Sequence, residues 1–322
     1  MSLQDEYHAA TRGLAVYDAS RWGRIAISGA DHLDFLHRMS TNDILGLAPR
    51  RGLQTAFCDH RGRLVEVAEV CRLDETESIS FVAPGRAAAL LQWLEHYHFS
   101  EAIAWREATA YGGQLEVVGA QVEAVAAVAL GLSLSGIDSL GLVECPLPLR
   151  ACRVDAVGSP GLRIWGPEPD LDAMRRLLLD ARASNLSEET WEVLRIEGGR
   201  PLAGRELTLD HNPWEARMSG AIDLDKGCYV GQEVVARLDT YKKVKQHLVG
   251  LVLEASVTPE APVEVEGRPA GALTSVCCSP ALGWLALAYM RAAYCTPGLA
   301  VSVASAKGPV AGQVHGLPFF AT

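Results

Sequence analysis

The sequence of 322 residues lacks the cysteine and histidine patterns that hold a metal ion within one chain. Its cysteines form no C-x-x-C pair, and no histidine cluster stands near them at zinc spacing. The clustered thiolates that carry an iron–sulfur cluster are missing as well. We therefore predict reduced thiols and no resident metal. The eight cysteines are Cys58, Cys71, Cys145, Cys152, Cys228, Cys277, Cys278 and Cys295.

A targeting segment and a membrane span are also lacking. Residues 1–6 are polar and acidic, which is not the pattern of a signal peptide. The uncharged run of residues 124–137 is too short, and too rich in glycine and serine, to cross a bilayer. We therefore expect a cytoplasmic protein without a membrane partner.

Positive charge is scarce, because 29 Lys and Arg residues stand against 39 Asp and Glu residues, which gives a net charge of −10. This acidity argues against nucleic acid as a main partner. The composition that remains, with 49% hydrophobic and 21% charged residues, is typical of a soluble globular chain. Its length predicts about two domains.

The most specific stretch is the segment 226–233, which reads Lys-Gly-Cys-Tyr-Val-Gly-Gln-Glu. Its two glycines predict a tight turn, and Gln232 begins a run that is typical of a helix start. A thiol at a helix N-terminus beside Lys226 favours a reactive Cys228. An inert, packed thiol is an equally good interpretation, because free cysteine is among the most buried residue types.

The first 182 residues show alternating strand and helix patterns, which predict a two-layer α+β fold. A hairpin is expected over residues 53–72, and Asp31 is expected to cap a helix. The other expected strands are 23–29, 78–83, 102–108, 114–118, 149–155 and 161–165, and the other helices are 4–11, 86–97, 120–130 and 170–182.

Two carboxylates stand at unfavourable places. Glu66 lies on a largely apolar face of the second hairpin strand, so it is either a pocket residue or half of a buried ion pair. Glu197 lies in the last turn of a helix over 188–197 capped by Ser187, where the helix dipole disfavours negative charge. It requires a partner, either a nearby arginine or a ligand with N–H donors.

After Lys245 the helical periodicity ends, and six strand-like runs predict a small all-β barrel. The basic run 241–245 marks the boundary. It is either a solvated linker or an anion-binding rim of a cleft between domains.

Several segments together resemble the GcvT/YgfZ superfamily, which includes the T-protein of glycine cleavage and the YgfZ-type folate-binding proteins. They are G-L-A-V-Y-D at 13–18, S-T-N-D at 40–43 and W-E-V-L-R-I-E-G-G-R-P at 191–201. The segment 226–233 matches the K-G-C-Y-x-G-Q-E signature of the YgfZ branch residue for residue. The resemblance runs over nearly the whole chain.

This resemblance implies a ring of ferredoxin-like α+β subdomains and a C-terminal β-barrel around a tetrahydrofolate site. The implied domains are 1–245, with subdomains of about 1–105 plus 185–245 and 106–184, and 246–322. By resemblance Glu197 binds the pterin ring, Glu66 lies near the bridging nitrogen of folate, and Arg237 meets its glutamate tail together with Lys242, Lys243 or Lys245. Tyr229 and Gln232, on either side of the signature's second glycine, are further candidates for the cofactor site.

The chain departs from the T-proteins in ways that bear on activity. They have Asp where this chain has Glu66, and one added methylene displaces a carboxylate enough to matter. Their version of the 226–233 signature contains no cysteine. The main functional hypothesis is therefore a YgfZ-type accessory protein that binds tetrahydrofolate and uses Cys228 in assembly or repair of iron–sulfur clusters in client proteins.

Two alternatives stay open. One is a folate-dependent aminomethyltransferase or methyltransferase, in which Glu66 assists proton transfer. The other is a non-catalytic role of the shared fold, because fold does not fix function.

Overall fold

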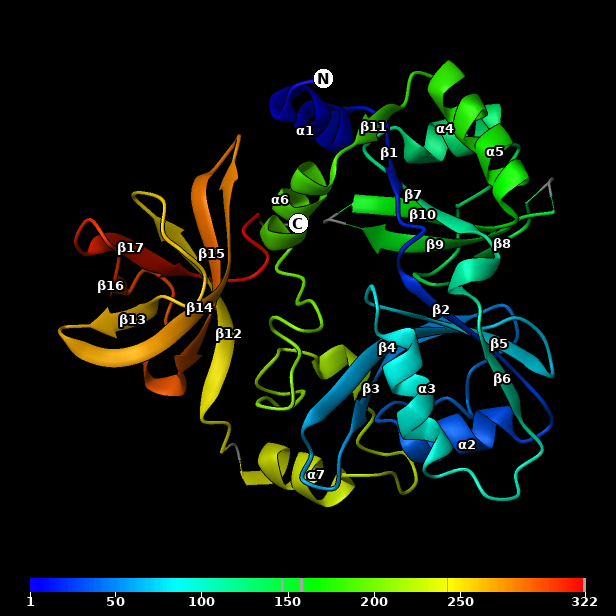
Figure 1. The fold of residues 1–322 in the computed structure, drawn as a ribbon, viewed down its shortest axis with the longest axis horizontal. Helices are drawn as coiled ribbons and strands as arrows, with labels where there is room; N and C mark the ends of the chain where they lie inside the picture. Colours follow the sequence, from blue (N-terminus) through cyan, green and yellow to red (C-terminus); the bar gives the residue numbers. More distant parts are fainter. Residues whose placement is uncertain (146–147, 157–158, 242, 321–322) are drawn as a thin grey trace.

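The computed structural model describes residues 1–145, 148–156, 159–241 and 243–320. Two mixed α/β lobes and a β-barrel surround a central region, as Figure 1 shows. The expected α+β ring with a C-terminal barrel is confirmed, and the barrel is closed by six strands. Among the described residues, no helix has the length and apolar character needed to cross a bilayer.

The first lobe is an antiparallel sheet with the order β3-β4-β5-β2-β6. Its strands are β2 (Gly23–Ser28), β3 (Gly52–Cys58), β4 (Leu64–Arg72), β5 (Glu77–Val82) and β6 (Ala104–Glu107). The helices α2 (His32–Met39) and α3 (Ala87–Glu95) pack on one face, where side chains such as Phe35, Phe57 and Leu90 form a core. The expected hairpin is confirmed, with Phe57 opposite Glu66.

Asp31 stands at the N-cap of α2 as expected, but its side chain makes no capping hydrogen bond to the helix. Instead its carboxylate accepts a hydrogen bond from the backbone N–H of Ala102 at 2.7 Å. Asp31 therefore ties the start of α2 to the segment that leads into β6.

The second lobe has the strand order β11-β1-β7-β10-β9-β8. Its strands are β1 (Ala15–Asp18), β7 (Gly113–Val118), β8 (Leu142–Val143), β9 (Arg150–Ala156), β10 (Ser159–Gly166) and β11 (Ser184–Leu186). The pair β1–β11 is parallel and the others are antiparallel. The helices α4 (Val122–Ala129) and α5 (Glu168–Asp180) pack against this sheet. Thus β1 belongs to the second lobe, although β2, five residues later, belongs to the first.

Three further helices join the lobes to the barrel: α1 (Leu3–Arg12), α6 (Glu188–Glu197) and α7 (Gln232–Tyr241). Ser187 caps α6 as expected, since its Oγ accepts the N–H of Thr190. Short 3₁₀ turns lie at Thr109–Tyr111, Ser219–Ala221 and Ala292–Tyr294.

The barrel closes in the order β12-β15-β14-β13-β16-β17. Its strands are β12 (Gln246–Leu253), β13 (Pro262–Val265), β14 (Arg268–Ser279), β15 (Gly283–Arg291), β16 (Ala300–Val303) and β17 (Val310–His315). Its interior is filled by alternating small and branched side chains such as Val263, Ala286 and Ala288. The barrel packs against α6 through β14 and β15.

Candidate functional site

A cavity of about 240 Å³ lies where both sheets, α6 and the segment after it meet. Aromatic walls and ionisable groups of both signs line it, which is typical of a small-molecule site. The lining residues are Trp22, Gln54, Glu66, Val67, Ala68, Glu69, Phe81, Val82, Ala83, Glu116, Arg163, Trp191, Arg195, Gly199, Arg200, Pro201, Leu202, Ala203, Leu207 and Met218.

Glu66 is both a cavity residue and half of an ion pair, so the two interpretations of its position hold together. Its Oε2 lies 2.7 Å from Nε of Arg86, and its Oε1 accepts the backbone N–H of Val67 at 3.0 Å. Burial raises the pKa of Glu66, and Arg86 opposes that shift. A carboxylate whose pKa is raised is a stronger base and is therefore better suited to accept a proton.

Glu69, three positions after Glu66 on β4, also lines the cavity. Its Oε2 accepts a hydrogen bond from Nη1 of Arg163 at 2.5 Å. Arg163 also donates through Nε to Oε1 of Glu116 at 2.5 Å, and its guanidinium lies 4.5 Å from the centre of the Phe81 ring. This Glu69–Arg163–Glu116 cluster connects the two sheets at the cavity wall.

The electrostatics of the cluster follow from its burial. Burial opposes the charge of Glu69, but the nearby charges of Arg163 and Arg200 outweigh it and lower its pKa. Burial raises the pKa of Glu116 in spite of Arg163. Sequence reasoning missed Arg163 and Glu116. The signal available was Glu69 itself, a carboxylate on an apolar strand face, but its partners lie on strands of the other lobe.

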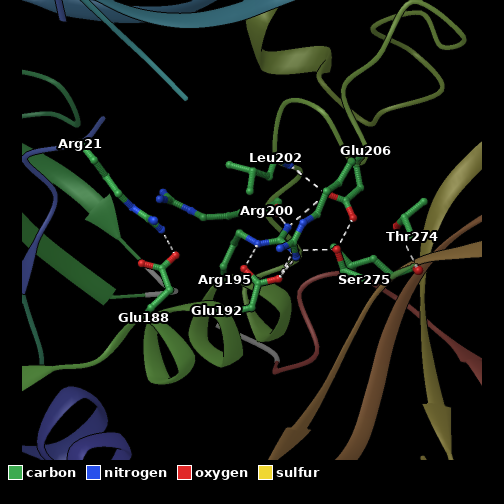
Figure 2. A network of polar contacts seen from close by, with 11 residues as sticks. Arg21, Glu188, Glu192, Arg195, Arg200, Leu202, Glu206, Thr274 and Ser275 are labelled. Carbon is green, nitrogen blue, oxygen red and sulfur yellow. Dashed lines mark hydrogen bonds and ion pairs between the residues drawn. The ribbon is translucent and has the colours of Figure 1, made fainter. Parts of the chain in front are cut away.

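A second polar network fixes the α6 side of the cavity, as Figure 2 shows. Arg195 donates to both carboxylate oxygens of Glu192, at 2.8 and 2.7 Å, and lies 3.2 Å from Glu206. It also donates to Oγ of Ser275 on β14 at 2.8 Å, and Ser275 donates to Glu206. Arg195 therefore serves as a connection between α6, the following loop and the barrel.

Glu197 does not line this cavity. It is 1% exposed, and its Oε2 accepts a hydrogen bond from the hydroxyl of Tyr7 on α1 at 3.1 Å. Its partner is thus neither Arg195 nor Arg200. Burial raises its pKa, and its Oε1 has no hydrogen-bond partner among the described residues. An orphaned buried acceptor of this kind fits a ligand that offers N–H donors.

The 226–233 segment forms a loop fixed at both ends. Lys226 points inward and donates to the backbone carbonyls of His37, Ser40 and Asn42, and burial lowers its pKa to about 8. A Cβ at Gly231, whose φ is +84°, would lie 2.5 Å from the carbonyl oxygen of Asp59 in the β3–β4 turn. Only glycine allows this close approach.

Cys228 is exposed between these two anchors, while Tyr229 is buried. The ammonium of Lys226, held by the three carbonyls, lies 5.0 Å from the centre of the Tyr229 ring. The hydroxyl of Tyr229 has no hydrogen-bond partner among the described residues. None of these three residues lines the cavity.

The predicted tail-binding residues lie on and after α7. Gln232 is half-buried, and Arg237, Lys243 and Lys245 are exposed. Lys242 lies outside the described residues. The structure therefore does not bring Glu66, Glu197 and Arg237 to one cavity wall.

The comparisons with known proteins cover almost the whole chain. Residues 1–226 match the GCVT N-terminal domain, and residues 246–321 match the glycine cleavage T-protein C-terminal barrel domain. The aminomethyltransferase of Exiguobacterium sibiricum is 27% identical over 301 residues, which are 92% of this chain and 83% of that protein. A chloroplastic protein of Arabidopsis thaliana named as a transferase is 27% identical over 322 residues, 96% of this chain and 72% of its own length.

A solved structure shows the same fold. The glycine cleavage system aminomethyltransferase T from Bartonella henselae superposes with a TM-score of 0.90, at 23% identity, over 99% of this chain and 90% of its own. The order of lobes and barrel is therefore shared from end to end. With both of its domains matched in sequence, the chain belongs to the glycine cleavage T-protein family.

Proposed function

We propose that the protein is a tetrahydrofolate-dependent transferase that takes a one-carbon unit from an amine. The observation that carries this proposal is the central cavity, where aromatic walls meet three glutamates. The names of the full-length relatives, which are aminomethyltransferases, favour this function over the accessory role expected from the sequence.

The side chains present fit a folate. Trp22 is half-buried in the cavity wall and can stack on a planar ring. Outside the cavity lining, the orphaned Oε1 of Glu197 remains our candidate acceptor for pterin N–H groups, and Arg237 remains our candidate for the glutamate tail. When bound, tetrahydrofolate would supply the nitrogen that accepts the one-carbon unit.

The role of the chain itself is to position the reactants and to move protons. Glu66, held by Arg86 and by the N–H of Val67, would take a proton from the reacting nitrogen. The apolar side chains of Phe81 and Val82 in the cavity wall would lower the local dielectric constant, which strengthens the interactions between charges in the cavity. We therefore expect the carboxylate of Glu66 to be held in one position when it accepts the proton.

Calorimetry with tetrahydrofolate tests the binding half of the proposal. Trp22→Ala should weaken binding about tenfold, because base–aromatic stacking is worth roughly 1–3 kcal/mol per ring by alanine substitution. Trp105→Ala, on β6 and outside the cavity lining, is the matched control and should bind as the wild type does. A wild-type protein that does not bind tetrahydrofolate would refute the proposal.

The transfer half is tested by assaying methylenetetrahydrofolate formed from an aminomethylated lipoyl carrier, whose carbon already has the oxidation state of the product and which releases ammonia and the free thiol. Glu66→Gln should lower kcat at least a hundredfold while tetrahydrofolate binding persists, because general-base catalysis contributes roughly 10²–10⁴-fold. A variant as active as the wild type would exclude Glu66 as the base.

One observation favours a second candidate, a YgfZ-type role in iron–sulfur cluster assembly or repair in client proteins. Cys228 is exposed, outside the cavity, on a loop held by the hydrogen bonds of the buried Lys226 and by the close backbone approach at Gly231. In a deletion strain, Cys228→Ala should fail to restore the activity of iron–sulfur enzymes. Cys278→Ala, which removes another exposed thiol, should restore it. Equal restoration by both variants would contradict this role.

A further inference from the structure

The three glutamates of the cavity differ in their exposure and in the number of their carboxylate oxygens that have a hydrogen-bond partner. The side chain of Glu66 is 1% exposed, and both of its oxygens have partners. The side chain of Glu116 is 4% exposed and bonds to Arg163 and Gln114 through Oε1 alone. The side chain of Glu69 is 22% exposed, and its Oε1 has no hydrogen-bond partner among the described residues. Glu69 is therefore the carboxylate most available to a ligand.

Among the described residues, the ion pairs around the cavity leave one oxygen of Glu69 without a partner. Glu69 and Glu116 share the guanidinium of Arg163. Arg86 pairs with Glu66, Arg195 meets Glu206, and Glu192 pairs with both Arg195 and Arg205. Arg200 donates to the carbonyl of Asp155, and its charge lowers the pKa of Glu69 without a direct bond to it. The free Oε1 of Glu69 is thus a carboxylate oxygen of the cavity wall that is open to a hydrogen-bond donor.

Arg163 also fixes the direction of this carboxylate. It bonds one oxygen of Glu69, is itself bonded to Glu116, and lies over the Phe81 ring. Glu116 is held in turn by Nε2 of Gln114 at 2.8 Å. The second oxygen of Glu69 is therefore presented in one orientation, as a binding group must be.

The chemistry of such a site selects an amine. An ammonium group donates up to three hydrogen bonds and forms a charge-assisted bond with a carboxylate. Its N-alkyl groups suit the half-buried ring of Trp22, because an aromatic ring face attracts cations. A neutral group lacks the charge-assisted bond to Glu69.

We propose that Glu69, oriented by Arg163 and Glu116, binds the ammonium group of the amine that donates the one-carbon unit. This assignment rests on the proposed transferase function and adds to it a substrate-binding residue and a chemical class. In this assignment Glu66 accepts the proton, Glu69 pairs with the positive charge of the amine, and Arg163 is a positioning residue that orients Glu69.

Calorimetry with butylammonium chloride and with 1-butanol, a neutral alcohol of the same length, tests the proposal without any reaction. The wild type should bind the amine at least tenfold more tightly than the alcohol, which is about 1.4 kcal/mol. Glu69→Gln should abolish this preference and leave the affinity for tetrahydrofolate within twofold. Glu75→Gln, which removes an exposed charge beyond the end of β4, is the matched control and should keep the preference.

Two further variants keep the test decisive if Glu69→Gln does not fold. Glu69→Asp retains the charge but places it closer to the backbone of β4. The preference for the amine over the alcohol should therefore become smaller but should not disappear. Arg163→Lys should weaken amine binding and raise KM for the amine more than it lowers kcat. An amine preference absent from the wild type, or unchanged in all three variants, would overturn the assignment. Loss of tetrahydrofolate binding in the wild type would instead refute the proposed function.

Discussion

At the scale of single residues, the charge of Glu66 depends on Arg86. Burial favours the protonated carboxyl, and the guanidinium 2.7 Å away opposes it. A general base works only when it is ionised, so activity should fall at low pH as Glu66 takes up a proton. The pH at which kcat falls on the acidic side of the pH profile, its acidic limb, therefore depends on the ion pair between Glu66 and Arg86.

We predict that Arg86→Met moves the acidic limb of kcat against pH upward by about one unit. Removing a neighbouring opposite charge raises a carboxyl pKa by roughly 1–3 units, and the partial exposure of Arg86 places the effect at the low end. Arg86→Lys keeps the charge and should leave the limb close to its wild-type place. An unshifted limb in Arg86→Met would mean that Glu66 is not the titrating base.

The sequence predicted the carboxylates of the site more readily than their partners. Glu66 and Glu197 were recognisable because each charge stands in an unfavourable place, on an apolar strand face and at a helix C-terminus. Tyr7, Arg86 and Arg163 were not predicted as partners, because they are 190, 20 and 94 residues from the carboxylates that they meet. Spacing along the chain carries no signal for contacts that only the packing of separate helices and strands creates.

At the scale of elements, the start of α6 combines a local cap with a distant one. Ser187 accepts the N–H of Thr190 and itself donates to the buried carboxylate of Glu6 on α1. Oε2 of Glu6 also accepts the N–H of Ser187 at 2.8 Å and the hydroxyl of Thr190 at 2.7 Å. The local cap was predictable from Ser187, whereas the contribution of Glu6 required the packing of α1 on α6.

We predict that Glu6→Gln lowers the free energy of unfolding by about 1–2 kcal/mol at pH 7, because charge-assisted bonds at a helix N-terminus are lost. Glu189→Gln, an exposed change in the same first turn, should cost less than about 0.5 kcal/mol. Urea unfolding followed by circular dichroism measures both values. Equal effects of the two variants would contradict the distant cap.

The same contact predicts a pH dependence. Burial opposes the ionisation of Glu6, but the hydrogen bonds from Ser187 and Thr190 outweigh it, so its folded pKa lies below the ordinary value of a glutamate. Its stabilisation is therefore present above the ordinary pKa and is lost as the pH falls through the folded pKa. The wild type and Glu6→Gln should thus become similar in stability once the pH lies below the folded pKa of Glu6.

At the scale of the whole molecule, the barrel is attached to the lobes through a buried charge network. Arg195 is 4% exposed and Glu206 is fully buried, and Ser275 brings β14 into the same set of bonds. Strand patterns predicted the barrel, because period-2 alternation is local. They did not predict its attachment, which joins residues 80 positions apart.

We predict that Arg195→Met destabilises the protein by about 3–5 kcal/mol, because it leaves the buried charge of Glu206 without its partner. Arg205→Met removes the exposed arginine that contacts Glu192 and should cost less than about 1 kcal/mol. Thermal or urea unfolding distinguishes the two. A small effect of Arg195→Met would show that the network holds little of the barrel's attachment.

The early crossing of the chain from β1 to β2 has a consequence for synthesis on the ribosome. All strands of the first sheet lie within residues 23–107, so that sheet is the first to have its full set of strands outside the exit tunnel. Strand β1 is made earlier, but its neighbours β7 and β11 begin only at residues 113 and 184. Because such distant pairings close slowly, the nascent chain carries residues 15–18 as an unpaired strand until at least β7 has been translated, and the pairing of β1 with β11 waits until more than half of the protein has been made.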